Sequence, residues 1–215
     1  MRPFGVMGCL LLLSGGCTSA VPDRVRVYND DGVHLFRRGD YLQARDTFQA
    51  ALELAPEDVS LRYNLAQSCE HMGDRDRAEK LYQECLQKDP GHADSRQALC
   101  VLMVRQGRSA EASRMVEEWL AKEPARGDAY ALDGWLWHQA GDLPRAQSRL
   151  QQALQFDAGN VRAMNELALI YEAMRRPERA YALYERSLDA QPEQPEIVVR
   201  VNRLKAQGVS FPKPD

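Results

Sequence analysis

The chain has 215 residues, of which 27% are charged and 7% are aromatic, and its formal net charge at pH 7 is -3. Removing residues 1–17, whose only charged residue is Arg2, makes this balance one unit more negative. Proteins that bind nucleic acid neutralise phosphates with a basic surface, so the charge argues against a nucleic-acid partner.

The first feature along the chain is a short apolar run at residues 6–13, which follows the positive charge of Arg2. It is far shorter than the roughly 20 residues that a membrane-spanning helix needs. We therefore expect residues 1–16 to be a signal peptide that is removed. The residues Ser14, Gly15, Gly16 and Cys17 come next. They resemble the lipobox of bacterial lipoproteins, in which small residues precede a cysteine that is diacylated and becomes the new N-terminus.

The lipobox resemblance implies a membrane anchor. Cys17 would carry a diacylglycerol and an N-acyl chain, and no other cofactor is expected. Thr18 is not the aspartate that often retains such proteins at the inner membrane, which favours the periplasmic face of the outer membrane. Residues 17–24 would form a lipidated tether of at most roughly 30 Å. Ordinary cleavage near Ala20 is the alternative.

From residue 25 onward, a pattern returns at a spacing of 34 residues. Two columns are filled in all five copies, one by alanine (Ala44, Ala78, Ala112, Ala146, Ala180) and one by leucine (Leu52, Leu86, Leu120, Leu154, Leu188). A glycine column (Gly39, Gly73, Gly107, Gly141) lapses to Arg175, and a proline column (Pro56, Pro90, Pro124, Pro192) lapses to Ala158 in the fourth copy. Self-similarity at a period of this size indicates an array of structural repeats.

The chemistry of these columns predicts a helix, a short turn and a second helix in each repeat. Gly39 can end the first helix in a left-handed conformation. Asp40 can then cap the second helix with its carboxylate, as can Asp74 and Asp142. Ala44 is small enough for two helices to approach closely, and Pro56 ends the second helix. One such pair cannot bury its apolar face alone, so neighbouring pairs are expected to stack in one elongated domain.

The pattern resembles the tetratricopeptide repeat (TPR) family. The residues that carry the resemblance are Gly32, Leu35, Ala44, Phe48, Ala51 and Pro56, with Leu35 where an aromatic residue is usual. The family implies an all-α TPR solenoid of five helix-turn-helix repeats at 25–194, namely 25–58, 59–92, 93–126, 127–160 and 161–194. The third repeat departs most, because Val116 and Trp119 stand where an aromatic residue and an alanine are usual. We expect Gly134 to make room for Trp119.

A last helix is predicted at residues 195–208, as a capping helix or the first half of a sixth repeat. Ile197, Val198, Val201 and Leu204 are expected on its covered face. The tail at 209–215 contains Pro212 and Pro214 and is expected to be flexible.

The sequence offers little chemistry for catalysis. Cys69, Cys85 and Cys100 occupy inward helix positions and are expected to be buried thiols. An oxidising compartment leaves a bridge between Cys85 and Cys100, or between Cys69 and Cys85, as the alternative. The histidines lack the spacing of a zinc site, and no catalytic or phosphate-binding motif is present. We therefore expect a protein that is not an enzyme and holds no metal.

In the TPR family, the first helix of each repeat lines a concave groove that binds a partner. The positions that point into it imply a partner-binding groove formed by Asn29, Val33, Phe36, Tyr63, Gln67, Gln97, Val101, Val104, Trp135, Asn165 and Leu169. Amides can bond the backbone of an extended peptide while apolar neighbours hold its side chains. Trp135 is a candidate hot spot, whereas Trp137 is expected in the core. The alternative is that some of these residues pack against the next repeat.

Some family members clamp a C-terminal carboxylate, but only Asn64 matches that clamp here, and Val33, Asp94 and Ala98 stand at its other positions. A partner with an apolar segment is expected instead. The combination of lipid anchor and repeats resembles the pilotins of type IV pili, which help secretins form rings and so support pilus biogenesis and motility. The alternatives are an accessory factor in outer-membrane barrel assembly or envelope maintenance, and an adaptor of peptidoglycan hydrolases.

Overall fold

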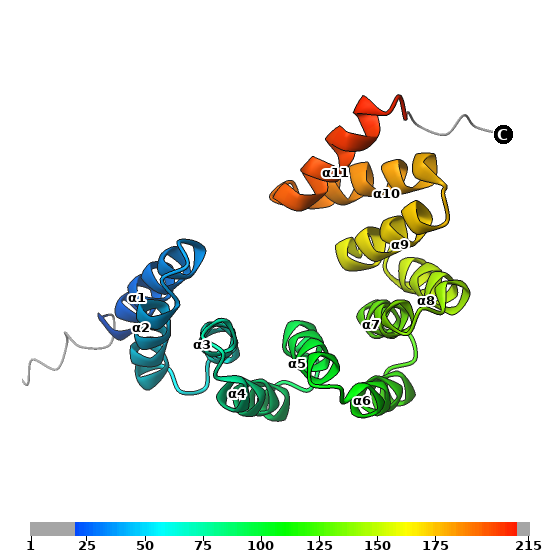
Figure 1. The fold of residues 1–215 in the computed structure, drawn as a ribbon. Helices are drawn as coiled ribbons and strands as arrows, with labels where there is room; N and C mark the ends of the chain where they lie inside the picture. Colours follow the sequence, from blue (N-terminus) through cyan, green and yellow to red (C-terminus); the bar gives the residue numbers. More distant parts are fainter. Residues whose placement is uncertain (1–19, 210–215) are drawn as a thin grey trace, which may run out of the picture. The chain divides into compact units, whose positions relative to one another are not determined.

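The structure, a computed structural model, describes residues 20–209, and every regular element in that range is an α-helix (Figure 1). The prediction of an all-α fold is confirmed. The signal peptide at 1–16, the lipidation site Cys17 and the tail beyond residue 209 lie outside the described residues. The helices fall into two compact units that divide between Pro90 and Gly91, where a single elongated domain was expected. A Pro-Gly pair is a strong break in regular structure, which suits a boundary at this point.

Unit 1 consists of two consecutive helix pairs, and unit 2 consists of three pairs followed by a single helix. Unit 1 contains α1 (Ala20–Arg37), α2 (Tyr41–Leu54), α3 (Val59–His71) and α4 (Arg75–Lys88). Unit 2 contains α5 (Ala93–Arg105), α6 (Ser109–Lys122), α7 (Gly127–Gln139), α8 (Leu143–Phe156), α9 (Val161–Ala173), α10 (Pro177–Ala190) and α11 (Pro195–Ala206). Each predicted repeat therefore holds one pair, and α11 lies where the capping helix is predicted.

The first helix begins earlier than the repeat pattern indicates. The prediction that residues 20–24 form a tether is wrong, because α1 is already helical from Ala20. Pro22 lies in the first turn, where a helix tolerates proline. Asp23 is also in this turn, where its negative charge suits the helix dipole, and it pairs with Arg26 at 3.7 Å.

The turns within the pairs use a left-handed residue, as predicted. Gly141 has φ +79°, and the corresponding Arg175 adopts φ 56° despite its side chain. Asp74 and Asp142 cap the following helices by accepting from backbone N–H groups at 3.3 and 3.0 Å. Asp40 makes no such side-chain bond, which corrects the sequence prediction. Its carboxylate instead pairs with Arg38 at 3.1 Å.

In the first and fourth pairs, a glycine on the first helix lies against a large side chain on the second helix. A Cβ atom added to Gly32 would lie 2.6 Å from the ring of Phe48, and one added to Gly134 would lie 2.6 Å from Leu150. The expectation that Gly134 makes room for Trp119 is therefore wrong. Trp119 is buried under the guanidinium of Arg96, 4.4 Å from its ring centroid.

The three described cysteines are free and buried, so the prediction of buried thiols is confirmed. Burial raises the pKa of the Cys100 thiol to about 12 and also raises the pKa of Cys69. These thiols are therefore protonated and inert at neutral pH.

The last helix packs on one face only. Val201 and Leu204 are buried, and Ile197 packs partly against the same core. Val198 is 39% exposed, so its predicted place on the covered face is wrong. It follows Ile197 by one residue, about 100° around the helix, and this rotation turns its side chain away from the covered face.

Candidate partner-binding site

A hollow of about 310 Å³ opens between the first helices of the two repeats in unit 1. We call it the unit-1 hollow. It is lined by Val33, Phe36, Arg37, Phe48, Tyr63, Asn64 and Gln67. Four of these residues, namely Val33, Phe36, Tyr63 and Gln67, belong to the groove predicted from the sequence. Arg37 and Phe48 were not predicted there, although Arg37 directly follows Phe36 in the sequence and Phe48 is one of the residues that carry the family pattern.

The apolar walls of this hollow are held in place by neighbouring rings. Phe36 packs edge-on against His71 and Tyr41, with centroid distances of 5.0 and 5.2 Å. Tyr41 and His71 stack on each other at 4.6 Å. Phe48 is buried and forms the floor, where the absence of a side chain on Gly32 lets its ring lie against α1. The hollow is thus a preformed apolar surface, the usual property of a ligand site.

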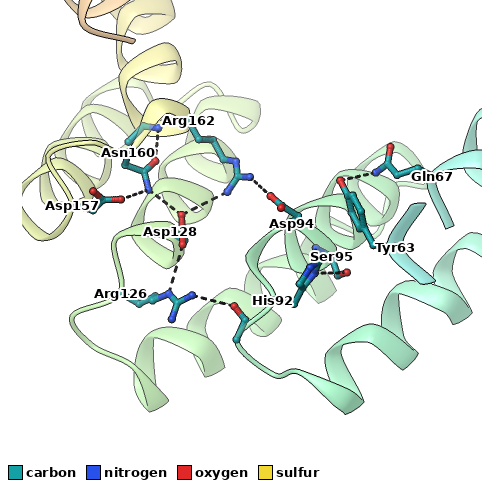
Figure 2. A network of polar contacts seen from close by, with 12 residues as sticks. Tyr63, Gln67, His92, Asp94, Ser95, Arg126, Asp128, Asp157, Asn160 and Arg162 are labelled. Atoms are coloured by element: carbon teal, nitrogen blue, oxygen red, sulfur yellow. Dashed lines mark hydrogen bonds and ion pairs between the residues drawn. The ribbon is translucent and has the colours of Figure 1, made fainter. Parts of the chain in front are cut away.

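The rim of the hollow is polar. Gln67 donates from Nε2 to the hydroxyl oxygen of Tyr63 at 3.0 Å (Figure 2). Asn64 donates from Nδ2 to Oδ1 of Asn29 at 3.2 Å, which ties α3 to α1. Asn29 also lines an adjoining cavity of about 450 Å³ at the start of α1, together with Val21, Pro22, Val25, Arg26, Leu54, Ala55, Asp58, Ser60 and Leu61. The amide oxygens of Asn64 and Gln67 remain able to accept bonds from a ligand.

The predicted groove residues of unit 2 are distributed over several environments. Val101, Trp135 and Leu169 are half-buried on the first helices of their pairs. Val104 lines a separate cavity of about 200 Å³ between α5, α6 and α7, together with Asp133 and Trp137, among others. Burial raises the pKa of the Asp133 carboxyl, although Arg149 lies 2.8 Å away and lowers it. Trp137, predicted in the core, packs against the buried cluster and lies under Arg145, 4.6 Å from its ring centroid.

The two amides predicted in the unit 2 groove are turned partly into the protein. Within the described part of the chain, the side-chain oxygens of Gln97 and Asn165 are buried without a hydrogen-bond partner. Asn165 donates from Nδ2 to Gln194 at 2.7 Å. It also lines a polar cavity of about 420 Å³, shared with Asp128, Asp157, Gly159, Asn160, Val161, Arg162 and Gln191.

A charged network, most of whose residues line this polar cavity, links three repeats of unit 2 (Figure 2). Arg162 lies 2.7 Å from Asp94 and 3.8 Å from Asp128. Asn160 donates to Asp128 at 2.9 Å and to Asp157 at 3.3 Å. Because these groups satisfy one another, we interpret the network as structural. Sequence reasoning missed it, although Asp94, Asp128 and Arg162 follow one another at the repeat spacing.

Among residues 20–209, no group of three or more histidine, cysteine or acidic side chains is placed to hold a metal ion. Within the same range, every helix is too short or too polar to cross a membrane.

Comparison with known families matches tetratricopeptide repeat models to residues 70–136 and 138–207, and to residues 30–93. No curated protein matches the chain. Among solved structures, TTC0263, a thermophilic TPR protein of Thermus thermophilus, is 22% identical, with a TM-score of 0.66 over 85% of this chain and 99% of its own. The pilF protein of Pseudomonas aeruginosa is 18% identical, with a TM-score of 0.57 over 88% of this chain and 86% of its own. At these identities the likeness concerns the fold alone.

Proposed function

The chain belongs to the tetratricopeptide repeat family, a family of protein-protein interaction scaffolds that are generally not enzymes, and from that premise we propose that it is a lipid-anchored assembly scaffold of the bacterial envelope. In this proposal its client is the secretin of a type IV pilus, and its role is pilotin-like. The protein would act at the periplasmic face of the outer membrane and support pilus biogenesis and motility.

The observation that carries the scaffold role is the unit-1 hollow. It combines rigid apolar walls from Val33, Phe36 and Tyr63 with the amide groups of Asn64 and Gln67. An extended peptide can place a side chain against such walls while its backbone bonds the amides. Catalysis would need perturbed acids, bases or nucleophiles at the site. The unit-1 hollow instead offers packing surface and hydrogen-bond acceptors.

The anchor is proposed from the sequence at residues 14–17. Cys17 precedes the start of α1 at Ala20 by three residues, which span at most about 10 Å. An acylated Cys17 would therefore hold unit 1 close to the bilayer surface. Confinement of the hollow near the membrane raises the local concentration of a client there, which favours assembly without requiring a very tight complex.

The proposal is tested by site-specific photocrosslinking in living cells from Tyr63 and from Trp135, with the adducts identified by mass spectrometry. A secretin adduct from Tyr63, together with monomeric secretin in a deletion strain, is the expected result. Normal secretin multimers in the deletion strain would reject the pilotin role. An adduct with a barrel-assembly component or a peptidoglycan hydrolase would select that alternative client.

A further inference from the structure

The unit-1 hollow is lined by apolar and neutral side chains and by one cation, and this combination indicates which kind of peptide it binds. Its walls are apolar and its rim residues are neutral, except for the guanidinium of Arg37. We propose that the segment bound in the hollow carries an apolar side chain next to an aspartate or glutamate, whose carboxylate pairs with Arg37. This inference rests on the proposed function, because it assumes that the hollow binds a peptide.

The first supporting observation is that Arg37 has no ion pair or hydrogen bond from its side chain within residues 20–209, whereas three other arginines of unit 1 are engaged. Arg38, the next residue, pairs with Asp40 at 3.1 Å. Arg45 pairs with Asp46 at 2.7 Å, and Arg62 pairs with Glu84 at 3.4 Å. Arg37 thus brings an uncompensated positive charge to an apolar surface, which attracts and orients a negatively charged ligand.

The second observation concerns the size of the hollow. Its volume of about 310 Å³ is at the lower end of ligand pockets and suits one large apolar side chain. Phe48 closes the hollow below, so the ligand's side chain would rest on this ring while its backbone stays at the rim. Adjacent residues of an extended peptide point to opposite sides, but a flexible acidic side chain at the rim can still reach a long arginine.

The third observation is the direction of the rim hydrogen bonds. Asn64 and Gln67 each use an N–H group inside the protein, on Asn29 and Tyr63 respectively. Their side-chain oxygens are left to accept, which suits the N–H groups of a peptide backbone. Enclosing a chain terminus would need several donors around its carboxylate. With Arg37 as the one cation lining the hollow, we infer an internal acidic residue and not a C-terminal carboxylate.

The experiment selects peptides from a random nine-residue library on the purified full-length protein and measures the affinity of the best peptide by fluorescence anisotropy. We expect the selected peptides to share an apolar residue beside an acidic one. Replacing that acid by its amide, or making the variant Arg37→Gln, should weaken binding about two- to fivefold, the range of a solvent-exposed ion pair. The two changes together should cost no more than either alone. Raising the salt concentration should remove the difference.

Arg38→Gln is the matched control, because it removes the same charge one residue away from a side chain that is already paired with Asp40. Its affinity for the selected peptide should equal that of the wild type. Equal binding of the acid and amide peptides, or an unchanged affinity in Arg37→Gln, would overturn the inference while leaving the hollow as a peptide site. Selection of peptides that require a free C-terminus would also overturn it. Failure to select any peptide, with the protein folded, would reject both this inference and the hollow as the client site.

Discussion

The close contact between Gly32 and Phe48 gives a prediction that links stability to binding. In Gly32→Ala, the new Cβ atom would lie 2.6 to 2.9 Å from three atoms of the Phe48 ring, so the ring has to move. Overpacking of this kind costs about 1–3 kcal/mol. Alanine is favoured over glycine inside a helix by about 1 kcal/mol. The net expectation is a loss of about 1 kcal/mol in the free energy of unfolding.

Gly134→Ala is a matched control from the same repeat position. Its Cβ atom would lie 2.6 Å from Leu150, which lines none of the unit-1 hollow, so its cost in stability should be similar. Urea unfolding followed by circular dichroism measures both free energies, and anisotropy with the selected peptide measures both affinities. Only Gly32→Ala should weaken peptide binding, because Phe48 forms the floor of the hollow.

Two results would refute this reasoning. A Gly32→Ala variant that gains the full helix-propensity benefit of about 1 kcal/mol would show that Phe48 does not press on α1. Equal loss of affinity in both glycine variants would show that binding responds to global stability and not to the hollow. The additional change Phe48→Leu should recover part of the stability of Gly32→Ala, because a smaller side chain relieves the contact.

Four further outcomes are expected. Cys17→Ala should release the protein from the membrane fraction and leave its circular dichroism unchanged; an unfolded variant would contradict the separation of anchor and fold. Arg175→Gly should raise the free energy of unfolding by about 0.5 kcal/mol, because glycine relieves the strain of the left-handed backbone conformation by more than it adds to the entropy of the unfolded chain. A lower free energy of unfolding in urea would show that this strain is absent. Glu172→Gln should lower the free energy of unfolding by about 1–2 kcal/mol and speed amide hydrogen exchange in α11. The reason is that the Glu172 carboxylate accepts from Tyr184 at 2.7 Å and pairs with two arginines of α11. An unchanged exchange rate in α11 would refute this prediction. Burial raises the pKa of the Cys100 thiol, so the folded state holds the thiol proton more tightly than the unfolded state does. The stability that this proton contributes is complete below about pH 9 and is lost as the pH rises toward about 12. In Cys100→Ala, the free energy of unfolding measured in urea should therefore depend less on pH in this window.

The fold could be predicted because each repeat position has one dominant physical requirement. Gly141 and its equivalents need a positive φ, and Ala146 and its equivalents are fully buried where two helices meet. Such requirements are local, so a single sequence with five copies reveals them. The early start of α1 at Ala20 could not be found in this way, because those residues precede the repeat frame and have no equivalents to compare.

The site could be predicted only in part, because the repeat pattern defines groove positions within each single repeat. It predicts Phe36 and Tyr63, which meet in the unit-1 hollow. It missed Arg37, whose importance lies in having no partner among residues 20–209, a property that depends on every neighbouring side chain. It also missed the ion pair between Asp94 and Arg162, which joins residues two repeats apart. The 34-residue pattern specifies contacts within a repeat and between adjacent repeats, but it does not specify contacts between repeats that are not adjacent in sequence.

The twelfth position of the repeats distinguishes those that can place an apolar wall there from those that cannot. In the second and fifth repeats this position is Glu70 or Glu172, and each carboxylate accepts from the hydroxyl of the tyrosine twelve residues later, Tyr82 at 2.9 Å and Tyr184 at 2.7 Å. A buried tyrosine needs such a partner for its hydroxyl.

In the first repeat the tyrosine is replaced by Phe48, which has no hydroxyl to satisfy. Its twelfth position is therefore free to be apolar, and Phe36 occupies it as a wall of the hollow. Exchanging Phe48 for tyrosine would place a hydroxyl on the floor of the hollow, where the twelfth residue offers no acceptor. The pairing of residues across two helices, and not the identity of either column alone, thus decides which repeat can present an apolar binding surface.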